Sequence, residues 1–189
     1  MIVQTHRLIG EYLYDVMQKD RSLSIKLSRR RFVYGNVLPD IVSDYKKYSH
    51  YYHKNHNYVF GLLKKLVTEP YSDDKFSEDL GILMHFFADY TCVYHACEYL
   101  SQEVSISSHI KYEAKFHFYA MRELKSKPLP KALLPFNSLD DIEYYVDKLT
   151  KRHNVAPYIV SVADDFRDLL ELTTSTLYYI LREREKRQI

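Results

Sequence analysis

Histidine and carboxylate side chains recur at helical spacing in the stretch MHFFADYTCVYHACEYLSQEVSISSHIKYEA, residues 84–114. His85 and Asp89 are four residues apart, as are His109 and Glu113, and His95 lies between the two pairs. Residues i and i+4 share one face of a helix, so each pair presents an imidazole beside a carboxylate. Neutral imidazole and carboxylate oxygen are good zinc ligands, and a catalytic zinc needs three protein ligands and one open position. The spacing therefore indicates metal chemistry.

The position of His95 bears on how many metal sites this stretch could build. In an unbroken helix His95 lies about 240° around the axis from Asp89, so it points elsewhere. This argues against a single mononuclear site and is compatible with two sites. A lone histidine on a helix is more often a core or surface residue than a ligand. Two His-x3-acid pairs in an apolar region are harder to explain in that way, because burying an acid without a cation or donor is unfavourable.

Long helices must position these side chains. Only 4 glycines and 6 prolines occur in 189 residues, and 46% of the residues are hydrophobic, which suits one core with few breaks. We therefore predict an all-α protein, a single-domain bundle of long helices around a multinuclear metal site. Within residues 1–189, we expect ligand motifs over 1–125, a linker over 126–138 and C-terminal helices over 139–189. Apolar periodicity predicts helices over residues 3–18, 22–34, 55–67, 76–101, 105–125, 139–151 and 155–186.

Two further segments supply candidate residues from outside the long helices. Gly35 and Pro39 interrupt the chain in GNVLPD, so Asp40 directly follows a break, where a side chain can be aimed. The polar stretch over residues 43–54 is rich in tyrosine and histidine and is a candidate lid or site wall.

Charge and composition narrow the class of protein. The formal charge is +2, with 27 basic and 25 acidic residues, which is too balanced for a nucleic-acid binder held mainly by electrostatics. Cys92 and Cys97 lie five residues apart in one predicted helix, a poor geometry for a disulfide, and favour a reducing compartment. The sequence shows neither a signal peptide nor a transmembrane stretch, so we expect a cytoplasmic protein.

The spacing of the five residues resembles the metal-binding signature of the zinc-dependent phospholipase C family. The superfamily also contains the fungal single-strand-specific nucleases. The resemblance spans roughly residues 5–115. The motif that carries it is His85-x3-Asp89-x5-His95-x13-His109-x3-Glu113.

Three other segments resemble the family in the same order along the chain. His6, on the first predicted helix, is similar to the family's early histidine. GNVLPDI resembles its Gly-x-x-x-Pro-Asp segment and places Asp40. YSHYYHKN resembles the histidine segment that follows, where either His50 or His53 takes the role.

The resemblance implies a multinuclear zinc centre and hydrolysis of phosphoester bonds. Such a centre holds about two or three zinc ions, which activate water to attack phosphorus and stabilise the leaving alkoxide. The third ion depends on His6. The implied sets are His50, His85 and Asp89, with Asp40 as a further ligand or as the base that orients the bridging water; His95, His109 and Glu113; and His6 with a shared Asp89 oxygen.

Two features depart from the family's pattern. The secreted relatives hold the third metal with a new N-terminal amine, whereas here only Met1, five residues before His6, could play that part. Ile41 stands where phosphatidylcholine-cleaving relatives place an aromatic residue against the choline group. We therefore expect a small-molecule or lipid phosphodiester as the substrate, and an enzyme that is not specialised for choline lipids. Nucleic acid is expected only as a substrate, not as a binding partner. Candidate pocket residues, each with plain packing as the alternative, are Tyr51, Tyr52 and Tyr90.

Other readings of the histidines are less well supported. An HD-type phosphohydrolase requires an adjacent His-Asp doublet and a ferritin-like bundle requires Glu-x-x-His pairs, and the sequence contains neither. His56, His117 and His153 have no partner at useful spacing, and we interpret them as surface or structural residues. The alternative function is a non-catalytic, metal-stabilised helical domain that binds a partner or a phosphate-bearing ligand. Such a domain would lack an open metal position or the base Asp40.

Overall fold

The structure, a computed structural model, describes residues 1–20, 27–45, 47–98, 105–126, 134–155 and 161–188. The regular elements in these ranges are all helices, with no strand among them, which confirms the all-α prediction. The helices are α1 (Val3–Lys19), α2 (Arg29–Gly35), α3 (Leu38–Ile41), α4 (Tyr52–Thr68), α5 (Asp73–Thr91), α6 (Val93–Ala96), α8 (Ile106–Ser126), α9 (Leu139–His153) and α10 (Val162–Gln188).

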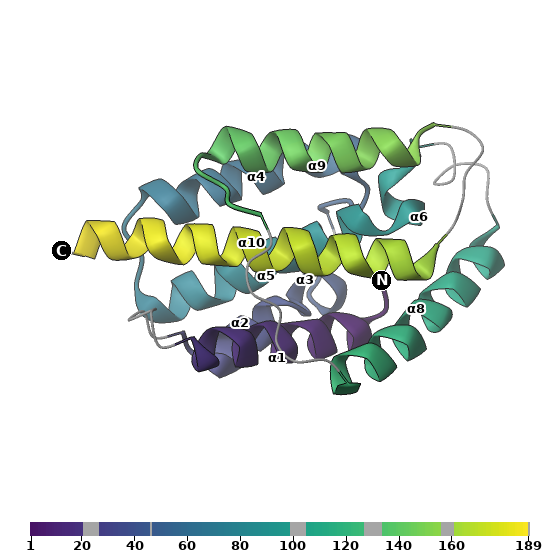
Figure 1. Cartoon of the computed structure of the whole chain (residues 1–189), viewed down its shortest axis with the longest axis horizontal. Coiled ribbons are helices and arrows are strands. Elements are labelled where there is room, and N and C mark those ends of the chain that lie inside the picture. Colours follow the sequence, from purple (N-terminus) through teal and green to yellow (C-terminus); the bar gives the residue numbers. More distant parts are fainter. Residues whose placement is uncertain (21–26, 46, 99–104, 127–133, 156–160, 189) are drawn as a thin grey trace.

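Helix α5 forms the centre of the bundle. From Leu80 to Thr91 every side chain of α5 is buried, as expected for a helix that is apolar nearly all round. Helices α1 and α2 lie along one side of α5, α4 and α9 lie along the other, and α10 crosses in front of it (Figure 1). Helix α8 lies at one end of the bundle and contacts α1 and α10. None of the helices described here combines the length and the apolar character needed to cross a membrane.

The predicted helices are largely confirmed, with shifts at their ends. Helix α4 begins at Tyr52, three residues before the predicted start. Ser138 begins α9 with the expected capping box, in which its hydroxyl accepts from the Asp141 N–H at 3.1 Å. Residues 21–26 and 156–160, which fall in two predicted helices, lie outside the described residues, as does most of the predicted linker. The division of the chain into a ligand-bearing part, a linker and C-terminal helices stays a prediction.

Two glycines let α2 and α5 cross at close range. A Cβ atom on Gly81 would lie 2.2 Å from the Phe32 carbonyl oxygen, and one on Gly35 would lie 2.1 Å from the backbone of α5. Only a hydrogen atom fits at these two positions. The crossing brings the end of α2 onto α5, where the Asn36 carbonyl oxygen lies 2.9 Å from His85 Nδ1. This contact orients the His85 ring.

Candidate metal centre

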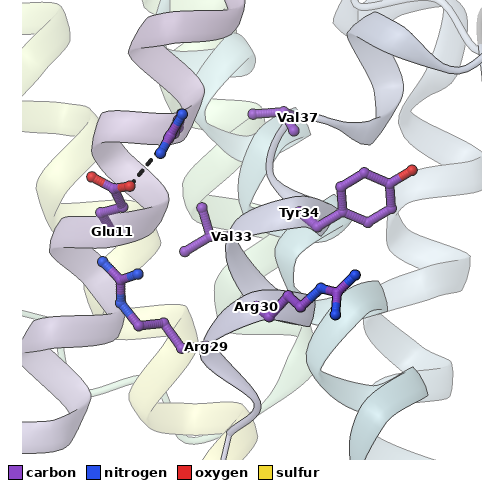
Figure 2. Close-up of a pocket in the computed structure, with 7 residues that line it drawn as sticks. Glu11, Arg29, Arg30, Val33, Tyr34 and Val37 are labelled. Carbon is purple, nitrogen blue, oxygen red and sulfur yellow. Dashed lines mark hydrogen bonds and ion pairs between the residues drawn. The ribbon is translucent and has the colours of Figure 1, made fainter.

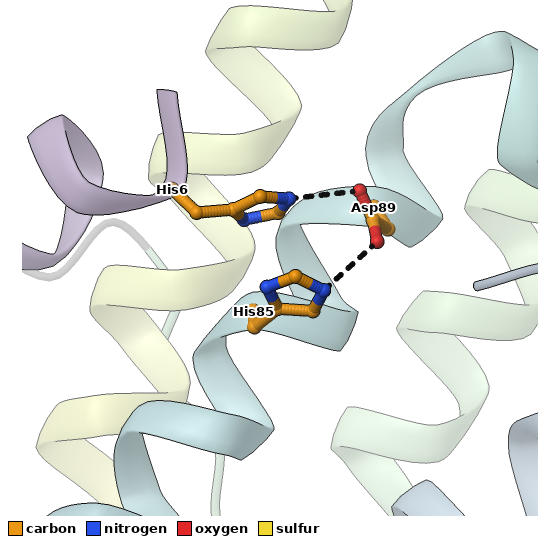
Figure 3. Close-up of side chains that lie close together, drawn as sticks. All are labelled: His6, His85 and Asp89. Carbon is orange, nitrogen blue, oxygen red and sulfur yellow. Dashed lines mark ion pairs between the residues drawn. The ribbon is translucent and has the colours of Figure 1, made fainter. Parts of the chain in front are cut away.

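Helix α5 places His85 and Asp89 one turn apart on a buried face, and α1 brings His6 to the same carboxylate. His85 Nε2 lies 3.3 Å from Asp89 Oδ2, and His6 Nε2 lies 3.2 Å from Asp89 Oδ1 (Figure 3). The two imidazole rings stack with their centroids 3.7 Å apart. None of the three side chains is exposed to solvent. Each oxygen of Asp89 therefore faces an imidazole.

Asp40 and His50 join this cluster from outside α5. Asp40 lies in the short helix α3, directly after Pro39, as the break in the sequence predicted. His50 Nδ1 lies 2.7 Å from Asp89 Oδ2 and 3.1 Å from His85 Nε2. Asp40 Oδ1 is 3.7 Å from His50 Nε2 and 3.9 Å from His85 Nε2. The segment that carries Asp40 and His50 thus meets His85 and Asp89 of α5, which lie far from it in the sequence.

The prediction of one unbroken helix over residues 76–101 is wrong, because the helix is interrupted at Cys92. Helix α5 ends one residue earlier, and Cys92 has extended backbone angles, φ −79° and ψ 123°. A new helical turn, α6, begins at Val93, whose backbone N–H donates to Asp165 Oδ2 at 2.9 Å. A hydrogen bond to α10 therefore holds the first residue of α6 in place.

The break turns His95 into the cluster, which corrects the expectation that it points elsewhere. His95 Nε2 lies 3.8 Å from Asp89 Oδ1 and 3.4 Å from Glu113 Oε1. His109 and Glu113 lie one turn apart near the start of α8, with His109 Nε2 3.1 Å from Glu113 Oε1. The rings of His95 and His109 meet edge to face, with centroids 4.9 Å apart. The two expected groups of side chains are therefore continuous in space.

Three sets of side chains, two of which share His85, could each hold a metal ion, because the ligand atoms within a set lie within 4.8 Å of one another. One set coincides with a set implied by the family resemblance. The other two sets differ from the implied ones. His85 belongs to both of them, and Asp89 groups with His6 and not with His50. His53 belongs to none of the sets found among the described residues. The eight side chains, called the metal group below, form the sets His6, His85 and Asp89; Asp40, His50 and His85; and His95, His109 and Glu113.

Unpartnered polar atoms indicate that the metal group suits a cation. Among the described residues, the buried atoms without a hydrogen-bond partner include His6 Nδ1, Asp40 Oδ2 and His95 Nδ1. Such atoms are rare in folded proteins unless a ligand, an ion or water satisfies them. A donor set of imidazole nitrogens and carboxylate oxygens is also the one that zinc prefers. The residues present therefore fit zinc.

The Met1 amine carries a positive charge into the centre of the metal group. Its nitrogen lies 2.6 Å from Asp89 Oδ1, 3.1 Å from His95 Nε2 and 3.2 Å from Glu113 Oε1. Burial opposes the charge, but the carboxylates of Asp89 and Glu113 raise the pKa of the amine to about 11. The amine thus lies beside the set that contains His6, where the resemblance places a terminal amine. Its role as a ligand stays a prediction.

The pKa shifts of several members of the metal group suit metal binding. Burial lowers the pKa of His6 well below its usual value and that of His95 to about 4, so both imidazoles are neutral at pH 7. Burial disfavours the Asp89 carboxylate, but the nearby amine and imidazoles outweigh it and hold its pKa well below the usual range. Glu113 is half-buried, which opposes its charge, but hydrogen bonds with His109 and His95 outweigh this and lower its pKa. His50 is the exception: burial opposes its charge, but its hydrogen bond with Asp89 and the charges of Asp89 and Asp40 raise its pKa.

A hollow of about 290 Å³ opens onto the metal group. Residues 48–51 form part of its wall, as proposed for the polar stretch over 43–54, together with Asp40 and Glu113. Of the three tyrosines suggested as pocket residues, only Tyr51 lines this hollow. Tyr90 is completely buried, and Tyr52 packs edge to face against it at 5.2 Å. Within the stretch over 43–54, sequence reasoning did not single out Tyr48 and Ser49, whose only signal is their position close to His50.

The remaining histidines lie outside the metal group. His117 Nδ1 is 3.0 Å from a threonine hydroxyl of α1, and His56 Nδ1 is 3.2 Å from a carbonyl oxygen of its own helix. His153 is buried, with Nε2 3.8 Å from Asp165 Oδ1. Both ring nitrogens of His53 are buried without a hydrogen bond. These contacts agree with structural roles for His56, His117 and His153.

A second hollow, of about 480 Å³, lies between α1 and α2 and shares no residue with the metal group. Arg29 and Arg30 line it beside two valines and Tyr34 (Figure 2). Its only carboxylate, Glu11, pairs with Arg7 at 3.1 Å. Positive charge therefore gathers in this cleft, away from the metal group.

Comparison with protein families gives a match along nearly the whole chain. The model of the family described as zinc-dependent phospholipase C matches residues 5–184. No curated protein and no solved structure matches the chain. The family match extends well beyond the motifs that lie within residues 5–115, and it includes α9 and most of α10.

Proposed function

The chain belongs to the zinc-dependent phospholipase C family, and from this premise we propose that it hydrolyses a phosphodiester bond with zinc ions bound by the metal group. The family match supports a lipid or other phosphoester substrate. The observation that carries the proposal is the convergence of eight candidate ligands from α1, α3, the segment before α4, α5, α6 and α8. They are His6, Asp40, His50, His85, Asp89, His95, His109 and Glu113.

Asp89 is proposed as the ligand that joins the three sets. Its Oδ1 faces His6 and His95, and its Oδ2 faces His85 and His50. A carboxylate with two oxygens can bridge two cations, whereas each imidazole offers one nitrogen to one cation. Zinc bound by such sets supplies a lowered pKa for nearby water and neutralises phosphoryl oxygens. The buried imidazoles of His6 and His95 are neutral at pH 7, which is the form that binds a metal.

Asp40 is proposed as the residue that orients the attacking water and accepts its proton. Its side chain is 15% exposed and lines the hollow, so one face of the carboxylate reaches substrate. Its Oδ1 lies near His50 and His85, while its Oδ2 has no partner among the described residues. Burial raises the pKa of Asp40, with help from the charge of Asp89, and a carboxylate with a raised pKa is the better proton acceptor.

The shape and lining of the hollow favour a phosphodiester with a small polar group. A volume of about 290 Å³ suits a lipid head group or a small molecule. Tyr48, Ser49 and Tyr51 offer hydroxyl groups and aromatic faces to such a group. Ile41, 47% exposed, supplies no aromatic face for a choline cation. The proposed substrates are therefore small-molecule or lipid phosphodiesters, with nucleic acid only as a further substrate.

The substitution Asp40→Asn tests the proposed catalytic role. Asparagine keeps an oxygen that can bind zinc but cannot accept a proton, so hydrolysis should fall by about 100-fold or more while zinc content is retained. Rates are measured with bis-nitrophenyl phosphate, a short-chain phosphatidylcholine, a short-chain phosphatidylserine and a single-stranded oligonucleotide. The matched control is Asp44→Asn, an exposed acid four residues later, which should leave the rates unchanged.

The outcome also decides between the enzyme and the non-catalytic alternative. Wild-type rates in Asp40→Asn would remove Asp40 from the mechanism. A wild-type protein that binds zinc but hydrolyses none of the substrates would instead support a metal-stabilised domain that binds a partner or a phosphate-bearing ligand.

A further inference from the structure

Helix α8 carries a row of exposed apolar side chains. Ile106 is 79% exposed, Ile110 is 58% exposed and Phe118 is 69% exposed. With Ala114 between them, they follow at intervals of four residues, which forms one continuous ridge along a helix. Scattered apolar residues on a surface need no explanation, but a contiguous apolar row commonly marks an interaction site. We call these four residues the α8 ridge.

Basic side chains border the α8 ridge on one side. Lys111 and Lys115 directly follow Ile110 and Ala114 in the sequence and are exposed. At about 100° per residue, they lie next to the ridge around the helix. The two acids in the described part of the helix face elsewhere, because Glu113 lines the hollow and Glu123 is only 16% exposed. The ridge with its border is therefore apolar and positively charged.

The α8 ridge also lies beside the metal group on the same helix. His109 precedes Ile110 by one residue, and Glu113 lies about 60° around the helix from Ile110, at about 100° per residue. Figure 1 shows α8 at one end of the bundle, where none of the other labelled helices lies against its outer side. A surface that met the ridge would lie close to the hollow above Glu113.

We infer that the α8 ridge docks the protein on an anionic phospholipid surface, with the apolar side chains among the acyl chains and the two lysines on lipid phosphates. An apolar strip with a basic border is the pattern of helices that lie in a membrane interface. The lysines favour a negatively charged surface over a neutral one, and the nearness of the metal group favours the surface that carries the substrate. The inference deepens the proposed function, since it names a membrane surface as the place where the lipid is reached.

Sedimentation with lipid vesicles tests the docking directly. The triple variant Ile106→Ser, Ile110→Ser, Phe118→Ser should bind vesicles of mixed phosphatidylserine and phosphatidylcholine about tenfold more weakly than wild type or worse. The matched control is Tyr144→Ser, which removes an aromatic side chain that is 70% exposed on α9, and it should bind as wild type. Lys111→Gln with Lys115→Gln should remove the preference for vesicles that contain phosphatidylserine.

A soluble substrate separates this inference from the proposed function. The triple variant should hydrolyse bis-nitrophenyl phosphate at the wild-type rate and lose activity only on vesicles, because its altered residues lie outside the metal group. Vesicle binding that depends on the α8 ridge, without hydrolysis of any substrate, would support the docking and contradict the proposed function. Unchanged vesicle binding in the triple variant overturns the docking. The docking is also overturned if the double variant Arg29→Gln, Arg30→Gln in the α1–α2 cleft loses vesicle binding while the triple variant keeps it. It is overturned as well if the wild type is a dimer that the triple variant disrupts.

Discussion

The metal group and the network around Asp165 both bury carboxylates, but they neutralise them in different ways. Asp165 Oδ2 accepts hydrogen bonds from the Val93 N–H and from the Tyr112 hydroxyl, and His153 lies beside its other oxygen. Its neighbours are thus mostly fixed hydrogen-bond donors of the protein. Around Asp89 the neighbours are imidazole nitrogens and an amine, and several buried atoms have no hydrogen bond. One carboxylate completes a structural network, whereas the other lies in a group of side chains that could hold a metal ion.

The two carboxylates also differ in charge state. Burial raises the pKa of Asp165 to about 7, because its hydrogen bonds do not outweigh the loss of solvent and the nearby charge of Asp168. The pKa of Asp89 is held well below the usual range by surrounding positive and polar groups, in spite of complete burial. Although both carboxyls are buried, Asp89 therefore stays ionised, whereas the pKa of Asp165 lies near neutrality.

The Asp165 network also supports the metal group. Val93 begins the turn that carries His95, and Tyr112 directly precedes Glu113 on α8. Asp165 contacts both residues from α10, so it ties together the two elements that hold one proposed set of zinc ligands. Such supporting contacts typically change metal affinity or activity by about 10- to 100-fold when they are lost.

The largest expected effect follows from replacing the carboxylate of the metal group. Asp89→Asn keeps the shape of the side chain but removes the charge that all three sets share or adjoin. Activity should fall by more than about 100-fold, the upper range for residues that only support a ligand. The same protein should retain less zinc per chain than wild type after gel filtration.

The control for Asp89→Asn lies on the same helix. Asp79 is also buried, but it pairs with Lys75 at 2.6 Å and belongs to none of the proposed sets. Asp79→Asn should therefore change stability while zinc content and hydrolysis stay as in wild type. Equal losses of zinc in both variants would mean that the metal group is no more suited to a cation than any buried acid.

A smaller effect should appear in the pH dependence of stability when Asp165 is replaced. A carboxyl whose pKa is raised on folding stabilises the fold fully below its unfolded value, and this contribution is lost as pH rises through the folded value of about 7. The free energy of unfolding of wild type, relative to Asp165→Asn, should therefore fall by about 2 kcal/mol or more between pH 4 and pH 8. Urea titrations at several pH values measure it.

The pH dependence that neighbouring groups contribute to stability cancels in this comparison, because the wild type and the variant both contain them. The pKa of His153 is lowered to about 4, mainly by burial, which gives a pH dependence of the opposite sign. Arg152, Asp168 and Tyr112 also face the carboxyl and are unchanged in the variant. Parallel stability curves for the two proteins would contradict a raised pKa at Asp165.

Much of the fold could be predicted from apolar spacing, since helices with a buried face repeat their apolar residues at 3.6-residue intervals. The break at Cys92 could not, because the local sequence Thr-Cys-Val has neither glycine nor proline. The hydrogen bond from Val93 to Asp165, 72 residues later, helps define the break. A contact between distant segments here overrides the helical pattern, and it decides where His95 points.

The site could be predicted as a list of residue types in order, but not as an arrangement. Regular spacing indicated that the five residues of α5, α6 and α8 act together, and the resemblance added His6, Asp40 and a choice between His50 and His53. His85 belongs to two sets because α2 crosses α5 at close range, and the sequence alone does not reveal this crossing. Tyr48 and Ser49 line the hollow because of the path of a non-helical segment, which has no periodic signal.

Zinc content per chain tests the central claim most directly. Untagged protein is washed with chelator, reconstituted with zinc, freed of excess metal and measured by mass spectrometry. The account predicts about two or three zinc ions per chain, each with three or four protein ligands at most. Essentially no zinc after reconstitution would contradict it, because the metal group would then be a buried cluster that binds no ion.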